Sequence, residues 1–258
     1  MITTNQNKQI KQIMKLKKSS RERRKQGLFL VEGIRMFQET PEERIHKIYA
    51  TEDFYKAHEA LFQEKEPELV SSQIMKEISD TMTPQGILVL VKIQEWNVEE
   101  ILDKDRPLLL VLENIQDPGN LGTILRTGEG AGISGLIMSR ETVDIYNPKV
   151  IRSTMGSIFR VPFVYVEQMS EFLELLRKKQ ITTYAAHLEG TNYTKEDFQK
   201  GCAFFIGNEG NGLSDKMTEQ ADKKIKIPMN GKVESLNAAM ASGLLMYEAR
   251  RQREEGGE

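Results

Sequence analysis

Short apolar runs alternate with helical patterns along the chain, and this alternation is the feature that most constrains its fold. In the second half, the runs that favour strands lie at 108–113, 135–139, 162–166, 182–187, 203–207 and 224–228. Several of them are nearly all apolar, which is typical of parallel strands covered by helices on both faces. The sequence therefore predicts an α/β domain with a parallel sheet, followed by a last long helix over about 235–253.

The first 95 residues repeat this alternation on a smaller scale. Strand candidates at 28–31, 45–50, 69–71 and 86–93 are separated by helix candidates at 32–40, 53–65 and 72–80. The stretch before Pro107 ends in charged residues and is typical of a linker. The 258 residues are thus expected to form a smaller N-terminal α/β domain (1–95), a linker (96–107) and a larger C-terminal domain (108–258).

The formal net charge of −2 conceals a strongly basic N-terminus. Residues 1–25 hold nine basic side chains and one acidic one, so this segment carries +8 and the other 233 residues carry −10. A basic segment on an acidic body favours binding to a polyanion. The candidate phosphate contacts are Lys15, Lys17, Lys18, Arg21, Arg23 and Arg24. The alternative is a solvated tail, but Ile10, Ile13, Met14 and Leu16 favour a short amphipathic helix that docks onto the domain.

Cysteine and histidine usage excludes several classes of site. The one cysteine, Cys202, rules out an internal disulfide and a multi-cysteine zinc site. His46, His58 and His187 are scattered, so no metal centre is expected. The longest apolar runs are five residues, against about 20 for a membrane helix, and the N-terminus lacks the pattern of a secretory signal. Cytoplasmic residence without membrane association is therefore expected.

One glycine pattern is misleading. Residues 130–135 read Gly-Ala-Gly-Ile-Ser-Gly and match the dinucleotide-binding pattern letter for letter. A dinucleotide site needs a strand before the glycines and a helix after them, and here the order is reversed. The pattern instead predicts a helix C-cap and a tight turn into a strand, which disfavours an ordinary nucleotide-dependent α/β enzyme.

Two strands of the C-terminal domain end in polar residues that packing does not explain. Asn114 follows the strand at 108–113, and Arg126 lies on the helix face opposite its apolar residues. The strand at 203–207 runs into a loop with three glycines in six residues, which permits close backbone approach to a ligand, and Glu209 lies inside this loop. The alternatives are a solvated arginine and an ordinary glycine-rich turn.

A third junction follows the strand at 224–228. Ser235 is a candidate N-cap, and Asn237 is a polar residue at the start of a helix rich in small side chains. Close helix packing explains the small residues but not Asn237. Because the carboxyl ends of parallel strands meet at one edge of a sheet, the three junctions together predict a ligand site there.

These residues resemble the three signature motifs of the SpoU (TrmH-like) branch of the knotted, S-adenosylmethionine-dependent RNA methyltransferases. The matching segments are Asn114…Asp117-Pro-Gly-Asn-Leu-Gly…Arg126, Gly207-Asn-Glu-Gly-Asn-Gly-Leu213 and Ile227-Pro-Met…Glu234-Ser-Leu-Asn-Ala-Ala239. They span about 108–250 in the order and spacing of the family. Residues 21–33 resemble the L30e-like substrate-binding domain that precedes the catalytic domain in many rRNA-modifying members.

The resemblance implies a fold and a cofactor. The C-terminal sheet would thread a deep trefoil knot, a rare exception to the rule that chains do not thread loops. The knot would bind S-adenosylmethionine, with Gly207, Ile227 and Leu236 lining the pocket largely through backbone groups. Family members work as homodimers with the active site at the subunit interface, so a homodimer is expected.

The resemblance also implies a reaction, the methylation of a ribose 2′-hydroxyl in structured RNA, with rRNA favoured over tRNA and DNA not expected. Arg126 matches a residue proposed as the general base, but a guanidinium normally stays protonated. Orienting the substrate phosphate and stabilising the developing alkoxide is the preferred role. The residues expected to position Arg126, the ribose and the donor are Asn114, Glu209, Ser235 and Asn237, and Glu209 is expected to pair with Arg126. The alternative is a non-catalytic RNA-binding protein on the same fold, which the loss of Arg126, Glu209 or Asn237 would favour; none is lost.

Overall fold

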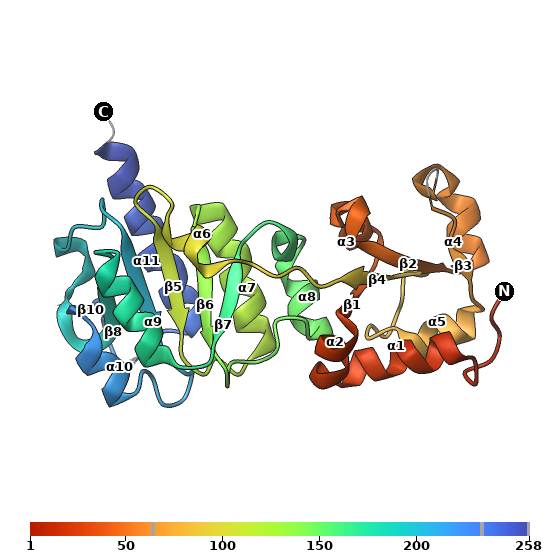
Figure 1. Cartoon of the computed structure of the whole chain (residues 1–258), viewed down its shortest axis with the longest axis horizontal. Coiled ribbons are helices and arrows are strands. Elements are labelled where there is room, and N and C mark those ends of the chain that lie inside the picture. Colours follow the sequence, from red (N-terminus) through yellow and green to blue (C-terminus); the bar gives the residue numbers. More distant parts are fainter. Residues whose placement is uncertain (63–64, 233–234, 257–258) are drawn as a thin grey trace. The chain divides into compact units, whose positions relative to one another are not determined.

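The computed structural model (Figure 1) describes residues 1–62, 65–232 and 235–256. The chain divides into two compact units, one of residues 1–94 with 144–159 and one of residues 95–143 with 160–258. Residues 144–159 therefore belong to the N-terminal unit, although the sequence placed them in the C-terminal domain. The segment 96–107, expected to be a linker, contains helix α6 (Val98–Leu102). The apolar side chains of this helix are buried in the core of the C-terminal unit, so the segment is part of that unit.

The N-terminal unit is built on a four-stranded sheet (Figure 1). Its strands, in spatial order, are β1 (Leu28–Glu32), β4 (Ile87–Lys92), β2 (Ile45–Ala50) and β3 (Glu68–Leu69). Strand β4 runs antiparallel to β1 and β2, and β2 runs parallel to β3. The helices are α1 (Lys8–Lys18), α2 (Ser20–Gln26), α3 (Ile34–Glu39), η1 (Glu42–Arg44), α4 (Glu52–Ala57), η2 (Glu59–Phe62), α5 (Ser72–Ile78), α8 (Pro148–Thr154) and η3 (Ser157–Phe159). The helix expected at 53–65 is thus two shorter elements, and its residues 63–64 lie outside the described part.

The basic N-terminal segment forms two helices, α1 and α2. The Asn7 side chain caps α1 by accepting a hydrogen bond from the Gln9 N–H. Three side chains of α1 are fully buried in one core with α5 and the sheet: Ile10, Ile13 and Leu16. This confirms the docked amphipathic helix. The exposed basic residues of this segment are Lys8, Lys11, Lys15, Lys18, Arg21, Arg24 and Lys25.

Arg23 does not face solvent, as a phosphate contact would require. Its side chain is buried, and its Nε and Nη2 donate to Asp144 Oδ2 at 2.8 and 2.5 Å. Its Nη1 donates to the Leu16 carbonyl oxygen at 2.6 Å. A buried guanidinium is stable only when it is paired in this way, so Arg23 fixes the 144–159 segment and does not face solvent. Lys17 is half-buried and donates to the carbonyl oxygens of Glu77 and Ser79.

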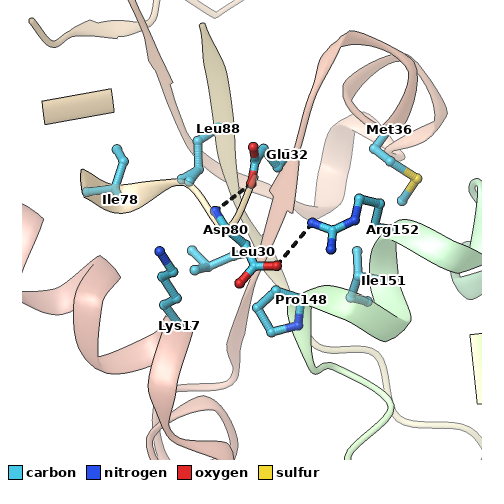
Figure 2. A pocket seen from close by; sticks show the side chains of 10 residues that line it. All are labelled: Lys17, Leu30, Glu32, Met36, Ile78, Asp80, Leu88, Pro148, Ile151 and Arg152. Atoms are coloured by element: carbon cyan, nitrogen blue, oxygen red, sulfur yellow. Dashed lines mark hydrogen bonds and ion pairs between the residues drawn. The ribbon is translucent and has the colours of Figure 1, made fainter. Parts of the chain in front are cut away.

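A small cavity of about 20 Å³ lies where α8 packs on this unit (Figure 2). In Figure 2 the Arg152 guanidinium points toward Asp80, and its Nη1 lies 3.0 Å from Asp80 Oδ2. The Asp80 N–H donates to Glu32 Oε2 at 2.8 Å, so β1, α8 and the turn after α5 are tied together. The volume is close to that of one water molecule, and its charged lining is paired internally. The paired charges around this cavity stabilise the fold, and the cavity itself is too small for a ligand.

The C-terminal unit holds a six-stranded sheet in which every pairing is parallel, as the sequence predicted. Its strands, in spatial order, are β10 (Lys223–Lys226), β8 (Thr182–Asn192), β9 (Cys202–Ile206), β5 (Leu108–Leu112), β6 (Gly135–Ser139) and β7 (Phe163–Val166). Its other helices are α7 (Pro118–Ala131), α9 (Met169–Lys178), η4 (Tyr193–Lys195), α10 (Asp215–Gln220) and α11 (Ala238–Glu255).

Helices cover both faces of this sheet (Figure 1). One core joins α6, α9 and α10 to the side chains of β5 and β9 that point to that face, such as Val111 and Phe205. Helices α7 and α11 pack together on the opposite face. Helix α7 ends at Gly132, whose φ of 76° is left-handed, so the glycine pattern at 130–135 is a helix C-cap as predicted. Among the described residues, no helix is long and apolar enough to cross a membrane.

Candidate active site

The three loops at the carboxyl ends of β5, β9 and β10 converge in the structure, as the sequence predicted. A chain of side-chain hydrogen bonds connects them. Asn237 Nδ2 donates to Asn120 Oδ1 at 2.9 Å, and Asn120 Nδ2 donates to Glu209 Oε1 at 2.9 Å. One residue from each motif thus takes part in a continuous polar chain.

Glu209 is held by the first turn of α7 and the loop before it. Its carboxylate accepts hydrogen bonds from the backbone N–H groups of Gln116 and Asp117, both at 3.2 Å, and from Asn120. Partial desolvation raises the pKa of the Glu209 carboxyl, but these hydrogen bonds outweigh it and bring the pKa below its ordinary value. The expected pair with Arg126 is absent among the described residues, because the α7 loop already occupies the carboxylate.

Asn114 shapes the loop after β5. Its backbone is left-handed, with a φ of 59°, a conformation that asparagine tolerates better than most residues. Its Oδ1 accepts a hydrogen bond from the Ser139 hydroxyl at 2.8 Å. Its carbonyl oxygen accepts one from Asn208 Nδ2 at 2.8 Å. The side chain therefore joins this loop to β6, and its backbone joins it to the glycine loop.

The start of the last helix differs from the prediction. The N-cap is Asn237, whose Oδ1 accepts hydrogen bonds from the N–H groups of Ala239 and Met240 at 2.9 and 3.3 Å. Ser235, the predicted cap, lies before the helix and lines the cavity described below. Asparagine and serine are equally good caps, so the sequence did not decide between them. Glu234 of the third motif lies outside the described residues.

Arg126 stands apart from this cluster. It lies on the exposed side of α7, and among the described residues it has no hydrogen-bond or ion-pair partner. It is also not part of the cavity wall. The structure therefore brings Glu209 and Asn237 together through Asn120, and Asn114 beside them, but leaves Arg126 free for a group outside the chain.

A cavity of about 390 Å³ opens beside the polar chain, within the size range of small-molecule sites. All three predicted cofactor-binding residues line it: Gly207, Ile227 and Leu236. A side chain on Gly207 would place its first carbon 2.0 Å from the Gly212 carbonyl carbon, so only glycine fits this crossing. Glu209 and Ser235 also line the cavity, together with His187 and Lys226. Among the described residues, no group of His, Cys, Asp or Glu is arranged to hold a metal ion.

Sequence reasoning missed three residues that organise the site: Asn120, Asn208 and Ser139. Asn120 bridges Glu209 and Asn237, and Asn208 joins the glycine loop to Asn114. Both stand inside the first and second motifs, so their position was a usable signal. Ser139 ends a strand that carries no motif, and only the fold places it beside Asn114.

Comparisons with known proteins agree with this architecture. The family described as the SpoU rRNA Methylase family matches residues 107–247, and the MRM3-like substrate binding domain matches residues 7–89. The chain is 32% identical to an uncharacterized tRNA/rRNA methyltransferase of Synechocystis sp., with 97% of this chain and 93% of that protein covered. It is 30% identical to the 23S rRNA (guanosine(2553)-2′-O)-methyltransferase RlmP of Bacillus subtilis, with 96% and 98% covered.

Solved structures give the same result over the whole chain. The SpoU methyltransferase AviRb of Streptomyces viridochromogenes in complex with the cofactor AdoMet superposes with a TM-score of 0.87 at 27% identity, covering 96% of this chain and 98% of that one. The AdoMet-bound rRNA methyltransferase of Sinorhizobium meliloti superposes with a TM-score of 0.85 at 27% identity, covering 97% of each.

Proposed function

The chain belongs to the SpoU rRNA methylase family, and on that premise we propose that it transfers a methyl group from S-adenosylmethionine to a ribose 2′-hydroxyl of ribosomal RNA. The observation that carries the proposal is the cleft lined by the second and third motif loops, which hydrogen bonds through Asn120 join to the first motif. Relatives named as rRNA 2′-O-methyltransferases favour ribosomal over transfer RNA as the substrate. We also propose that the protein resides in the cytoplasm, which the bacterial rRNA 2′-O-methyltransferases among its relatives support.

The cleft fits S-adenosylmethionine in size and in chemistry. Its volume of about 390 Å³ and its lining of glycine and aliphatic residues suit a nucleoside held by backbone groups. Gly207, Ile227 and Leu236 are the residues that would hold it. When bound, S-adenosylmethionine supplies a methyl group already activated by its positively charged sulfur.

The acceptor hydroxyl is a weak nucleophile that must lose its proton as it attacks. Arg126 is a cation without a partner in the described part of the chain, and it binds the phosphate beside the target ribose, where it also stabilises the negative charge that develops on the oxygen. Asn120, Glu209 and Asn237 hold the cleft wall in one geometry through their hydrogen-bond chain. Fixing the geometry of an attacking oxygen contributes up to about 7–11 kcal/mol to lowering a barrier of this kind. Ser235 lines the cleft, and Asn114 supports its wall because its carbonyl oxygen accepts a hydrogen bond from Asn208.

A second copy of the chain completes the site in this proposal. Helix α11 carries an exposed apolar stripe of Met240, Leu244 and Tyr247, which are 60, 39 and 48% exposed. Exposed apolar residues at helical spacing are typical of an interface. Helix α7, which carries Arg126, packs beside this stripe, with Gly130 against the Tyr247 hydroxyl. A homodimer through these helices would bring Arg126 of one copy near the cleft of the other.

The expected trefoil knot belongs to the same proposal. One close approach of distant segments supports it, since Gly190 lies against the backbone of Ile225, and Gly207 lies against residues 212–213 where its own loop closes. At both places a side chain would collide with main-chain atoms. Only glycine allows one segment of the chain to pass so close to another.

The N-terminal unit holds the RNA. The exposed residues Lys15, Lys18, Arg21 and Arg24 lie on the two basic helices and contact phosphates. Lys17 is held by carbonyl oxygens of its own unit and contributes less.

The test is methyl transfer from tritiated S-adenosylmethionine into ribosomal RNA from a strain that lacks the protein. We expect label at one ribose that resists alkaline cleavage, and its loss in Arg126→Ala. Arg140→Ala is the matched control, because Arg140 is exposed in the same unit but already pairs with Glu167 at 2.5 Å. Donor binding without label in any RNA would favour the non-catalytic RNA-binding alternative, and label that survives in Arg126→Ala would overturn the role of Arg126.

A further inference from the structure

A large bulge in β8 forms one wall of the cleft. In the pairing of β8 with β10, Ala185 lies opposite Lys224 and Thr191 lies opposite Ile225. Five residues of β8, 186–190, are therefore inserted between two adjacent pairs. Strand pairing fixes both ends of this bulge. Gly190 at its end lies so close to β10 that a side chain there would come within 2.5 Å of the Ile225 backbone.

The bulge presents His187 and Leu188 to the cleft. The His187 ring is held by its own loop, since its Nδ1 lies 3.2 Å from the Glu189 N–H. The backbone N–H is the donor in this contact, so Nδ1 must carry a lone pair. A neutral imidazole with a lone pair on Nδ1 carries its proton on Nε2. Among the described residues, Nε2 has no hydrogen-bond partner, so His187 offers the cleft an N–H donor.

The position of the bulge separates His187 from the reacting side of the cleft. Strand β9 lies between β8 and β5, and neighbouring strands are about 4.8 Å apart, so His187 and the loop that carries Asn114 are on the order of 10 Å apart. In this tautomer His187 has no free lone pair for the proton of the acceptor hydroxyl. The cleft wall that His187 shares also holds aliphatic side chains, among them Leu188, Ile227 and Leu236, which suit the flat face of a nucleobase.

We propose that His187 is a positioning residue for the methyl donor, and that its Nε2–H donates a hydrogen bond to the nucleoside half of S-adenosylmethionine. Ribose oxygens and adenine nitrogens are neutral acceptors that match a neutral donor. Lys226, also in the wall, is the cation better suited to the carboxylate of the amino-acid half. This inference rests on the proposed function, because it assumes that S-adenosylmethionine occupies this cleft.

The test is calorimetric titration of the full-length protein with S-adenosylmethionine and with 5′-methylthioadenosine, which lacks the amino-acid half. We expect His187→Ala to weaken both ligands by about 5- to 10-fold, the effect of one lost neutral hydrogen bond. His187→Gln keeps an N–H donor, so binding should stay within about 2-fold of wild type. His46→Ala is the matched control, since His46 is exposed on β2 in the other unit and should change neither affinity.

A second readout is the nitrogen NMR spectrum of the His187 ring. We expect Nε2 to be protonated in the free protein and its signal to shift when 5′-methylthioadenosine binds. Unchanged affinities in His187→Ala, a loss confined to S-adenosylmethionine, or a proton on Nδ1 would overturn the inference. Failure of the wild-type protein to bind either ligand would overturn the proposed function itself, and the inference with it.

Discussion

The two units each contain a cavity with charged residues in its wall, and the two cavities differ in what those charges do. In the N-terminal unit the cavity is about 20 Å³, and its charges are paired within the chain, as Arg152 is with Asp80 (Figure 2). In the C-terminal unit the cavity is about 390 Å³, and the charged Lys226 in its wall has no ion-pair partner among the described residues. Charges satisfied by the chain fix structure, whereas unsatisfied groups around an open cavity remain available to a ligand.

Arg23 and Arg126 show the same contrast in single residues. Both looked like solvent-facing arginines in the sequence. Arg23 is 4% exposed and donates to Asp144 and to a backbone carbonyl, whereas Arg126 is exposed and unpaired among the described residues. The difference predicts that changes around Arg23 act on stability and changes around Arg126 act on activity.

The largest expected effect comes from breaking the buried pair. Asp144→Ala leaves the Arg23 guanidinium buried without its carboxylate, which should lower the free energy of unfolding by about 3–5 kcal/mol. Chemical denaturation of the full-length protein measures this. The matched control is Asp53→Ala, an exposed carboxylate in the same unit, which should cost little. A loss below about 1 kcal/mol in Asp144→Ala would show that the pair does not hold the 144–159 segment.

The next effect concerns the polar chain of the cleft. Asn120→Ala removes hydrogen bonds to both Glu209 and Asn237, so methyl transfer should fall by about 10- to 100-fold, while the midpoint of thermal unfolding changes little. Asn237→Ala should give a similar loss of activity plus the stability cost of a lost helix cap, about 1 kcal/mol. Because the two residues act through one hydrogen bond, the double variant should lose less than the two single losses combined. If the losses of the two single variants add up fully in the double variant, Asn120 and Asn237 do not act through a shared hydrogen bond.

A smaller effect is expected at the basic helices. Lys18→Ala removes one exposed phosphate contact, so the slope of log affinity against log salt should decrease by about one, with a few-fold weaker binding to ribosomal RNA. Filter binding over a range of salt concentrations measures both. Lys56→Ala is the control, because Lys56 pairs with Glu52 at 2.6 Å on α4 of the same unit. Identical slopes for the two variants would separate the basic helices from RNA binding.

The smallest effect is a shift in titration. The pKa of Glu209 is lowered in the folded protein, so its contribution to stability is present above its pKa in the unfolded chain and is lost as the pH falls through its folded pKa. Asn120→Ala removes a hydrogen bond that favours the carboxylate, so the pKa of Glu209 should rise. Carbon NMR of the side-chain carboxyl over an acidic pH series measures this pKa. An unchanged value would place the cause of the lowered pKa in backbone N–H groups, those of Gln116 and Asp117 among them.

Much of the C-terminal unit could be read from the sequence. Strand β6 (Gly135–Ser139) has the predicted bounds, because a short apolar run after a helix C-cap has few other structures available. The convergence of Asn114, Glu209 and Asn237 also followed from the sequence, since parallel strands end at one edge. Their roles in catalysis, like those of Arg126 and Ser235, stay predictions.

The sequence was less informative where partners are distant in the chain. Arg23 was assigned to phosphate contacts because local charge does not show that Asp144, 121 positions later, lies beside it. The segment 96–107 was assigned to a linker because its charged end hid the apolar residues of α6. The bulge that presents His187 has no local signature, since it exists only in the pairing of β8 with β10.

By itself the sequence determined the order of strands and helices, the parallel sheet and the three motif loops, because these depend on local periodicity and on residues within a few positions of each other. Only the tertiary structure decided which charged side chains are paired within the protein and which are available to a ligand, because pairing depends on distances between segments far apart in the chain. The electrostatic cost of burial makes Arg23, paired with Asp144, an anchor of the fold, whereas Arg126 is exposed and has no partner within the described residues.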